Sequence, residues 1–280
     1  MDIRGKHVFI TGAGAGIGYE TALAFARAGG QVIATDVDAT GLAALAEAAA
    51  ATGLAIRTER LDVTDRAGYV ALAARLSAEC ADPDILINNA GVAFIGGFFD
   101  TPPEAWDRLI RINVMGVVNG CQVFGPAMAR AGRGVIVNVA SAASAGPPPN
   151  LSAYAATKFA VEGLSDVLAM ELQARGVTVI SVHPGVIDTA IVRDERGISP
   201  TVSEAQIQAL QHYYRTKGCH PRIVAQGIVD GVRRGRDKVF VGPVAQTSAW
   251  LRRFAPTRLK RILTVKNSRE IGYLPRTPTQ

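Results

Sequence analysis

Residues 11–18 read TGAGAGIG and join the apolar run VFI at 8–10 to an alanine-rich segment with helical spacing. Glycines at such a junction permit positive φ angles and close approach of another backbone or a ligand. Their spacing is GxxxGxG, formed by Gly12, Gly16 and Gly18, rather than the strict GxGxxG. A tight turn needs glycine for its own sake. A strand, a glycine-rich turn and a helix in succession nevertheless indicate a pyrophosphate site, because exposed N–H groups and the helix dipole attract an anion.

Outward from this turn, short apolar runs rich in β-branched residues alternate with longer amphipathic segments. The expected strands lie near 7–11, 31–36, 55–61, 84–88, 134–140, 177–182 and 238–241. The expected helices lie near 16–29, 39–52, 65–80, 103–130, 152–175 and 222–234. This alternation predicts an α/β fold, a doubly wound Rossmann-type parallel sheet of about seven strands with helices on both faces.

We divide the chain into a single Rossmann-type domain at 1–245 and a basic C-terminal extension at 246–280. A longer polar stretch at about 190–220, with a capped helix beginning near Ser203, follows the sixth strand. An insertion at the carboxyl end of a strand usually borders a ligand site.

The composition indicates a folded enzyme-sized chain in a reducing, cytoplasmic setting. Its 280 residues are 48% hydrophobic and 19% charged, which suits a large core and argues against disorder. The three cysteines form no CxxC pair, so we expect neither a disulfide framework nor a metal site. No secretory signal and no run of about 18 apolar residues is present, so no spanning segment is expected.

The net charge of +6 is unevenly distributed. Residues 250–280 contain eight basic residues and one acid, Glu270, which gives this stretch a charge of +7 and leaves −1 for the other 249 residues. The main body therefore gives no reason to expect nucleic-acid binding. Apolar residues at helical spacing within 246–266, interrupted by Pro256, predict two short helices. A basic amphipathic stretch such as 250–276 is typical of peripheral membrane contact, although we favour packing on its own domain or a partner subunit.

Acids and amides follow the second, third and fourth expected strands. Asp36 is placed to accept hydrogen bonds from both adenosine ribose hydroxyls and to repel the extra phosphate of NADP, while Asp38 better suits the cap of the next helix. Asp62, followed by Val63, is placed to bind the adenine amino group, although Asp62 or Thr64 also suits a helix cap. After the fourth strand, a group of residues either holds the turn rigid or lines the cofactor: Asn88, Asn89, Ala90 and Gly91.

Tyr154 and Lys158 lie four residues apart in the segment SAYAATK at 152–158, so on a helix they share one face. A free tyrosine has a pKa near ~10, and a neighbouring ammonium together with a cationic nicotinamide favours the phenolate. We therefore expect the pKa of Tyr154 to be lowered and its phenol to act as an acid and base. YxxxK is common on protein surfaces, and its meaning here comes from its position on the helix after the fifth strand.

Seven motifs occur in order along the chain: TGAGAGIG at 11–18, Asp62-Val63, NNAG at 88–91, Asn113, Ser141, YxxxK at 154–158, and Pro184-Gly185 with Thr189. With them the chain resembles the common branch of the short-chain dehydrogenase/reductase family over about residues 3–245. The resemblance implies an oxidoreductase that uses a nicotinamide dinucleotide and forms a homodimer or homotetramer.

The resemblance also implies roles for individual residues. Tyr154 corresponds to the acid/base, and Lys158 to the group that lowers its pKa and holds the nicotinamide ribose. Ser141 would bond the substrate oxygen, and Asn113 would hold a water that links Lys158 to solvent. The implied cofactor-binding residues are Gly12, Ala15, Gly16, Ile17, Gly18, Asp36, Asp62, Val63, Asn89, Ala90, Gly91, Tyr154, Lys158, Pro184, Gly185, Ile187 and Thr189.

Three residues near these motifs need separate interpretation. The family often has a serine where this chain has Ala140. Ser144 is an alternative hydroxyl, but Ser141 has the family's spacing of thirteen residues before Tyr154. His183 precedes Pro184, and we interpret it as structural rather than as a second acid.

The expected substrate wall is apolar and favours a lipophilic secondary alcohol or ketone, although such side chains also suit an ordinary core. It comprises Phe94, Ile95, Phe98, Phe99, Ala143, Pro147, Pro148, Val186 and Ile191, together with Ser141. The leading interpretation is an NAD-dependent alcohol dehydrogenase/reductase that needs no metal. Asp36 disfavours an NADPH-dependent ketoreductase. The intact proton-transfer residues disfavour a non-catalytic nucleotide-sensing protein on the same fold.

Overall fold

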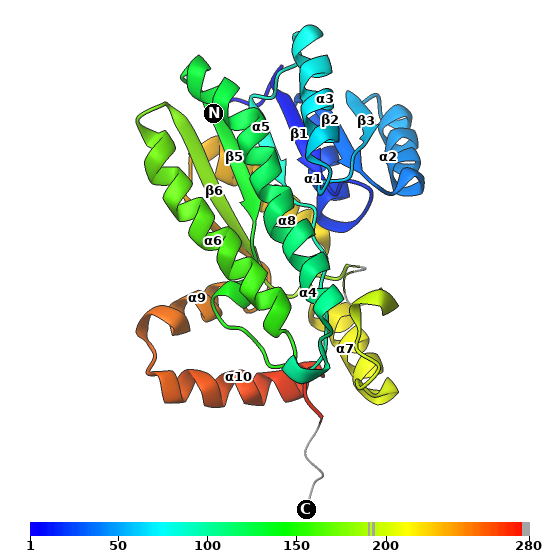
Figure 1. Cartoon of the computed structure of the whole chain (residues 1–280), viewed down its shortest axis with the longest axis vertical. Helices are drawn as coiled ribbons and strands as arrows, with labels where there is room; N and C mark the ends of the chain where they lie inside the picture. Colours follow the sequence, from blue (N-terminus) through cyan, green and yellow to red (C-terminus); the bar gives the residue numbers. More distant parts are fainter. Residues whose placement is uncertain (190, 192–193, 276–280) are drawn as a thin grey trace, which may run out of the picture.

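A computed structural model of the chain describes residues 1–189, 191 and 194–275. Within it, one sheet of seven parallel strands has the order β3-β2-β1-β4-β5-β6-β7 (Figure 1). The strands are β1 (His7–Thr11), β2 (Gln31–Asp36), β3 (Ile56–Arg60), β4 (Ile85–Asn88), β5 (Gly134–Val139), β6 (Val177–Pro184) and β7 (Lys238–Val241). The predicted doubly wound fold is confirmed. The strand order reverses between β1 and β4, which is where such sheets bind their ligands at the carboxyl ends.

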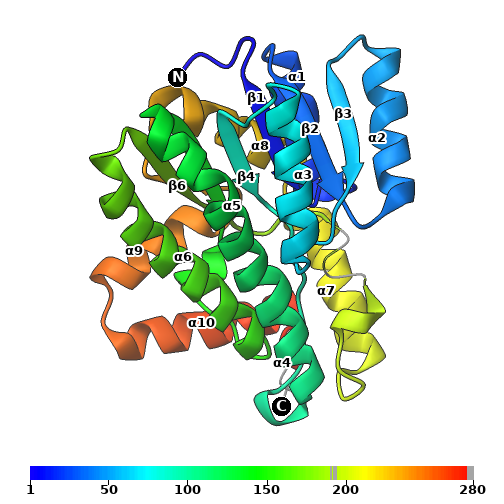
Figure 2. The same ribbon diagram turned by 45° about the horizontal axis from the view of Figure 1, so that its top comes forward.

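Helices cover both faces of the sheet (Figure 2). Helices α1 (Gly16–Arg27), α2 (Ala39–Ala51) and α8 (Pro221–Arg234) pack on one face, and α3 (Arg66–Ala78), α5 (Gly116–Ala131) and α6 (Ser152–Gln173) on the other. The other α-helices are α4 (Pro103–Leu109), α7 (Glu204–Lys217), α9 (Ala245–Phe254) and α10 (Thr257–Ile271). Short helices also occur at Phe98–Asp100, Ala142–Ser144 and Glu195–Gly197.

Alternation along the strands divides the interior into two hydrophobic cores. Val8 and Ile10 of β1 face the core under α1 and α8, while Phe9 between them faces the core under α3 and α5. Phe9 lies 4.6 Å from the ring of Phe124 and 6.2 Å from that of Tyr69, measured between centroids. Because such strands are buried on both faces, their sequences are continuous apolar runs and do not alternate between apolar and polar residues.

The single helix expected near 103–130 is instead made of three segments. Between α4 and α5, the residues Ile110–Met115 form a π-helix, which contains Asn113. Both amide atoms of Asn113 are bonded to groups outside this helix, and such tertiary bonds leave no mark in the local sequence pattern. A π-turn of this kind often lies at a functional site.

The C-terminal residues form the two helices that Pro256 predicts, α9 and α10. Helix α10 packs against α7, whose start is capped by Ser203 and Gln206 in the expected place. Gly272 ends α10 with a φ of +103°, a left-handed conformation that suits glycine, and directs Tyr273 inward. In the described part of the chain, no helix combines the length and apolar character needed to cross a membrane.

Candidate active site

The glycine-rich turn between β1 and α1 brings three backbone segments into close contact. Gly12 has a φ of +66°, and a Cβ on it would lie 2.7 Å from the Cα of Ala90. A Cβ on Gly18 would overlap the carbonyl oxygen of Gly12, so Gly18 lets α1 pack on the turn and does not itself line the cavity. No side chain caps α1 at Ala15, and its first N–H groups therefore face the cavity, ready for an anion.

The Asp36 carboxylate is held in place at the end of β2. Its Oδ2 accepts a hydrogen bond from the Gly14 amide at 2.8 Å, and its Oδ1 accepts one from the Asp38 amide at 3.0 Å. Asp38 caps α2 through the Thr40 amide, as the sequence predicts. Asp36 thus borders the cavity with Val37 beside it. The contribution of Gly14, which fixes the carboxylate, was not anticipated among the cofactor residues.

At the ends of β3 and β4, the structure distinguishes the residues that cap a helix or fix a turn from those that line the cavity. Asp65, not Asp62 or Thr64, caps α3, and Asp62 lines the cavity with Val63. Asn89 donates from its Nδ2 to the carbonyl oxygens of Thr11 and Gly12 at 2.9 and 3.0 Å. Asn89 therefore both fixes the glycine-rich turn and lines the cavity.

Asn88, the neighbour of Asn89, is buried instead, with its Nδ2 2.9 Å from the Oδ1 of Asn138 on β5. Ala90 and Gly91 continue the cavity wall.

Ser141, Tyr154 and Lys158 lie together in the lining of the same cavity. Ser141 follows β5, and its Oγ accepts a hydrogen bond from the Ala143 amide at 3.1 Å, which fixes the side chain. On α6, the Lys158 Nζ lies 5.7 Å from the centroid of the Tyr154 ring and donates to the Val139 carbonyl at 2.9 Å. The four-residue spacing of Tyr154 and Lys158 places both side chains in the cavity lining with Ser141.

Burial dominates the electrostatics of this cluster. It raises the pKa of the Tyr154 phenol, and a hydrogen bond with Ser141 only partly opposes that rise. It also lowers the pKa of Lys158 to about 8. The expected lowering of the Tyr154 pKa is thus not found in the chain by itself, because desolvation disfavours both charged forms. A positive charge near the phenol would oppose this effect of burial.

Asn113 lies behind the cluster and does not line the cavity. Its Oδ1 accepts from the Val92 amide at 2.8 Å, and its Nδ2 donates to the Val92 carbonyl at 2.9 Å and to Thr157 Oγ1 at 3.0 Å. Because Thr157 precedes Lys158 on α6, Asn113 ties the loop after β4 to the helix that carries Tyr154 and Lys158. These contacts make it a positioning residue in the described structure.

The loop after β6 forms the remaining wall near the glycine-rich turn. The Gly185 amide donates to the Val241 carbonyl at 2.8 Å, and a Cβ on Gly185 would overlap the Pro243 carbonyl. Thr189 lies opposite the turn, since its Cγ2 would be 3.3 Å from a Cβ on Gly16. The cavity lining includes the four residues expected here, Pro184, Gly185, Ile187 and Thr189.

The cavity has a volume of about 1670 Å³ and continues beyond Tyr154 into an apolar region. Among the expected substrate residues, Ala143, Pro147 and Val186 line this region. Phe94 does not, because its ring is buried in a separate cluster with Leu109 and Ala153. Phe99 lies outside the lining as well and is 96% exposed. The other expected wall residues are in the lining: Ile95, Phe98, Pro148 and Ile191.

Two lining tyrosines near Tyr154 were not anticipated. Tyr214 of α7 and Tyr273, just after α10, share a hydrogen bond of 2.6 Å between their hydroxyls. Burial raises the pKa of Tyr214 to about 12, so both hydroxyls stay neutral and can serve a substrate as hydrogen-bonding groups. No motif marks Tyr214, and Tyr273 lies in the extension, so the sequence carried no signal for either.

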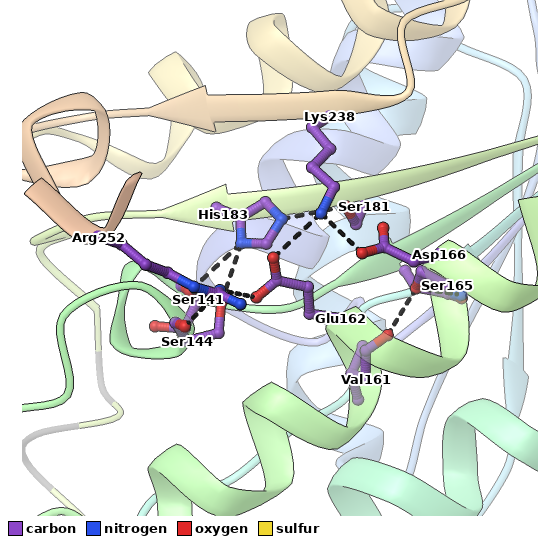
Figure 3. A network of polar contacts seen from close by, with 11 residues as sticks. Ser141, Ser144, Val161, Glu162, Ser165, Asp166, Ser181, His183, Lys238 and Arg252 are labelled. Carbon is purple, nitrogen blue, oxygen red and sulfur yellow. Dashed lines mark hydrogen bonds and ion pairs between the residues drawn. The ribbon is translucent and has the colours of Figure 1, made fainter. Parts of the chain in front are cut away.

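A network of buried and half-buried charges joins α6, β7 and α9 behind Ser141 (Figure 3). Glu162 accepts from Lys238 Nζ at 3.0 Å and from Arg252 Nη1 at 2.8 Å. Burial alone would raise the pKa of Glu162, but the hydrogen bonds from Lys238 and Arg252 help to hold it below its usual value. Arg252 also donates to the Ser144 carbonyl at 2.8 Å, so α9 is bonded to the segment that carries Ser141.

Ser144 and His183 lie outside the cavity lining and contact neighbouring groups of the fold. The Ser144 hydroxyl donates to the Ser141 carbonyl at 2.8 Å and contacts His183 Nδ1 at 3.1 Å. The other ring nitrogen of His183 lies 3.0 Å from Ser181 Oγ, and its ring stacks on Phe240. Burial lowers the pKa of His183, which is thus a neutral packing residue away from the cavity. In the described ranges, no group of three or more His, Cys, Asp or Glu side chains is arranged to hold a metal.

Comparisons with known proteins show the family of this chain. The family model described as "short chain dehydrogenase" matches residues 6–197. The "Probable oxidoreductase EphD" proteins of Mycobacterium bovis and Mycobacterium tuberculosis are 41% identical over 259 residues, which cover 90% of this chain and 44% of theirs. The chain therefore spans less than half the length of these relatives.

Two solved structures share most of the fold. A short chain dehydrogenase/reductase from Burkholderia phymatum in complex with NAD is 28% identical, with a TM-score of 0.82, and the match covers 100% of this chain and 99% of that chain. A short-chain dehydrogenase from Sphingobium yanoikuyae in complex with NADPH is 31% identical, with a TM-score of 0.72, covering 84% of this chain and 86% of that chain.

A Rossmann-like sheet with a glycine-rich turn at its switch point defines a class of oxidoreductases that bind a nicotinamide dinucleotide. Within this class, the chain belongs to the short-chain dehydrogenase/reductase family.

Proposed function

We propose that this oxidoreductase uses NAD to interconvert a lipophilic secondary alcohol and its ketone, with Tyr154 as the proton-transferring residue. The observation that carries the proposal is one continuous cavity. Its lining includes both the Asp36 carboxylate at the end of β2 and the Ser141, Tyr154 and Lys158 side chains. A dinucleotide is an elongated ligand whose two ends need such separate contacts.

The residues fit NAD at three places. The uncapped start of α1 faces the cavity and suits the pyrophosphate, and a Cβ at Gly12 would close the turn against Ala90. The fixed Asp36 carboxylate suits a ribose with two free hydroxyls and repels a phosphate there. When bound, the nicotinamide supplies the carrier for the hydride that the alcohol carbon loses or the ketone gains.

The protein's own residues would bind the substrate oxygen and move its proton. The Ser141 and Tyr154 hydroxyls are close enough to bond each other, so they can also share one substrate oxygen between them. In oxidation, the Tyr154 phenolate accepts the hydroxyl proton, and in reduction the phenol returns it. The Lys158 ammonium, 5.7 Å from the Tyr154 ring centroid, favours the phenolate when it is charged.

The apolar part of the cavity supports a lipophilic substrate. Its wall includes Ala143, Pro147 and Val186, together with Leu251 and Leu263 from the C-terminal helices. The neutral pair Tyr214 and Tyr273 offers one polar contact within this wall. Such a cavity binds an extended apolar molecule better than a small polar one.

A panel of secondary alcohols and ketones of increasing apolar size tests the proposal. Each is assayed with NAD or NADH and with NADP or NADPH, through the absorbance of the reduced nicotinamide. We expect turnover with NAD that improves as the apolar part of the substrate grows. Binding of NAD without turnover of any member would favour a nucleotide-sensing role, and faster turnover with NADPH would favour a ketoreductase.

A further inference from the structure

Helices α9 and α10 present bulky apolar side chains to solvent. Trp250 and Phe254 of α9 are 59% and 62% exposed, with their ring centroids 5.7 Å apart. On α10, Leu259, Ile262 and Leu263 are also exposed, and Ile262 reaches 65%. Because the α10 residues are spaced by three and four positions, they lie along one face of the helix. We call these five residues the C-terminal apolar face.

The opposite face of α10 accounts for its packing. Ser268 and Ile271 are buried, and Gly272 lies against α7. The expected packing of the extension on its own domain is therefore present, but it uses only this side of α10. The C-terminal apolar face is left over after that packing, so folding of this chain does not explain it.

Basic side chains surround the C-terminal apolar face. Arg253 stacks on the Phe254 ring at 5.5 Å, and Arg258, Lys266 and Arg269 are exposed on α10. None of these four residues forms an ion pair within the described part of the chain. Glu270 is the only acid in Ala245–Phe254 or Thr257–Ile271. A surface that is both apolar and strongly basic matches an apolar layer bordered by anionic groups.

A second copy of this chain fits the face less well than a bilayer does. In a two-fold symmetric contact, each patch faces the same patch of its partner. The cations around the C-terminal apolar face would then be brought next to like charges, which disfavours association. Anionic phospholipid headgroups supply the opposite charge, and the acyl chains beneath them take up the apolar side chains.

The two helices are also fixed to the domain. The hydrogen bonds of Arg252 to Glu162 and to the Ser144 carbonyl hold α9 against α6 and the segment after β5 (Figure 3). Leu263 belongs both to the C-terminal apolar face and to the lining of the large cavity. A surface bound to this face would therefore lie beside the cavity.

We propose that α9 and α10 dock this protein on an anionic phospholipid membrane, with the C-terminal apolar face inserted among the acyl chains and the surrounding cations bound to headgroups. The docking is peripheral and reversible, since it depends on a few side chains and on charge. It does not depend on the proposed reaction, because it needs no substrate and no cofactor. If the reaction is also as proposed, a lipophilic substrate enters the cavity directly from the membrane.

Vesicle sedimentation with the full chain tests the docking. The probes are vesicles of phosphatidylcholine alone and vesicles that contain phosphatidylglycerol as well. We expect binding to the anionic vesicles only, and we expect it to weaken as salt screens the charges. Arg258→Gln with Arg269→Gln, and separately Trp250→Ser with Ile262→Ser, should each raise the lipid concentration needed for half-binding by at least about tenfold, because the first pair removes two contacts with headgroups and the second removes two contacts with acyl chains.

Matched controls separate docking from general charge or folding effects. Arg233→Gln with Arg234→Gln removes two exposed arginines from the end of α8, and Val70→Ser removes an exposed apolar side chain from α3. These controls should bind vesicles like the unmodified protein, and circular dichroism should show every variant folded. Equal binding to both kinds of vesicle would overturn the proposal. The proposal would also be overturned if the protein bound no vesicles and light scattering showed a dimer that Trp250→Ser with Ile262→Ser dissociates.

Discussion

Tyr154 and Lys158 experience the same burial with opposite effects on their pKa values, the phenol being raised and the ammonium being lowered to about 8. Both shifts favour the neutral form. Oxidation of an alcohol needs the Tyr154 phenolate, so kcat/KM for oxidation should rise with pH and level off when the phenol has ionised. Reduction needs the phenol, so it should fall over the same range.

Variants of Lys158 test the source of this pH dependence. Lys158→Met removes the positive charge at every pH and should move the rise in oxidation to higher pH, while also weakening NAD binding. Lys158→Arg keeps a charge with different donor geometry, so only partial recovery is expected. A flat profile from about pH 6 to 10, with a deuterated alcohol showing that hydride transfer limits the rate, would contradict the phenolate mechanism.

Replacing Tyr154 by phenylalanine isolates the proton-transferring oxygen. The ring and its packing remain, so Tyr154→Phe should fold and bind NAD normally while kcat falls by about 10²–10⁴-fold, as is usual for a positioned acid or base. Steady-state kinetics and NAD titration by protein fluorescence measure the two effects. Retention of more than roughly a tenth of the activity would remove Tyr154 from this role.

Asp36 is the residue that should set the choice between NAD and NADP. We expect NAD to be preferred by at least about tenfold in kcat/KM, which corresponds to ~1.4 kcal/mol. Asp36→Asn removes the charge but keeps an oxygen that can accept from the Gly14 amide, so the turn should stay intact while the preference shrinks. The test compares kcat/KM with NAD and with NADP in the unmodified protein and in Asp36→Asn. Equal use of NADP by the unmodified protein would show that the carboxylate does not exclude the phosphate.

At the scale of the elements, Glu162 joins α6 to β7 and α9. Glu162→Gln leaves Lys238 and Arg252 without their shared carboxylate and should lower the free energy of unfolding by about 1–3 kcal/mol. Asp166→Asn is the matched control, because Asp166 pairs with the same Lys238 but is half exposed, so it should cost less than about 1 kcal/mol. Urea denaturation measures both. A similar loss of unfolding free energy in the two variants would mean that the burial of Glu162 does not make its ion pairs more stabilising.

The elements also show what the sequence could and could not predict. Strands such as 134–140 and the helix near 152–175 were predicted within two residues, because their periodicity is local and both faces of the sheet are apolar. Asp36, Ser141, Tyr154 and Lys158 line one cavity because parallel strands and the helices after them deliver their ends to one edge. Their chemical roles remain predictions.

What the sequence could not predict depends on contacts between distant residues. The π-helix around Asn113 is accompanied by bonds to Val92 and Thr157, and no local pattern encodes them. Phe94 was predicted to line the substrate cavity, but it is packed into a cluster with Leu109. Which of these environments the side chain enters depends on the path of the loop after β4. Tyr273 reaches the cavity only because α10 folds back onto α7, and Arg252 reaches Ser144 only because α9 packs against β7 and the short helix Ala142–Ser144.

For the whole molecule, the outer surface of α6 is the surface best suited to self-association. Met170 is 70% exposed and Val167 is 47% exposed. Gly163, four residues before Val167, has no atom within 4 Å of where its Cβ would lie, so the helix surface is flat there. Phe159 continues the same face by another four residues. Flat apolar helix faces of this kind allow two copies to approach closely, and Asp166, which is exposed on the same helix, is paired with Lys238.

We therefore predict a homodimer, or a tetramer built from such dimers, held together through α6. Met170→Glu with Val167→Glu places charges at the centre of this contact and should shift the protein to a monomer in light scattering. Trp250→Ser with Ile262→Ser should leave the oligomer unchanged, because the C-terminal apolar face lies on other helices. If the oligomer persists in the variant with both glutamates, the contact between subunits lies on another surface. If the unmodified protein is a monomer, the prediction of self-association through α6 is wrong. Since Tyr154 and Lys158 lie on the same helix, measuring turnover in the monomer then shows whether the contact also steadies the site.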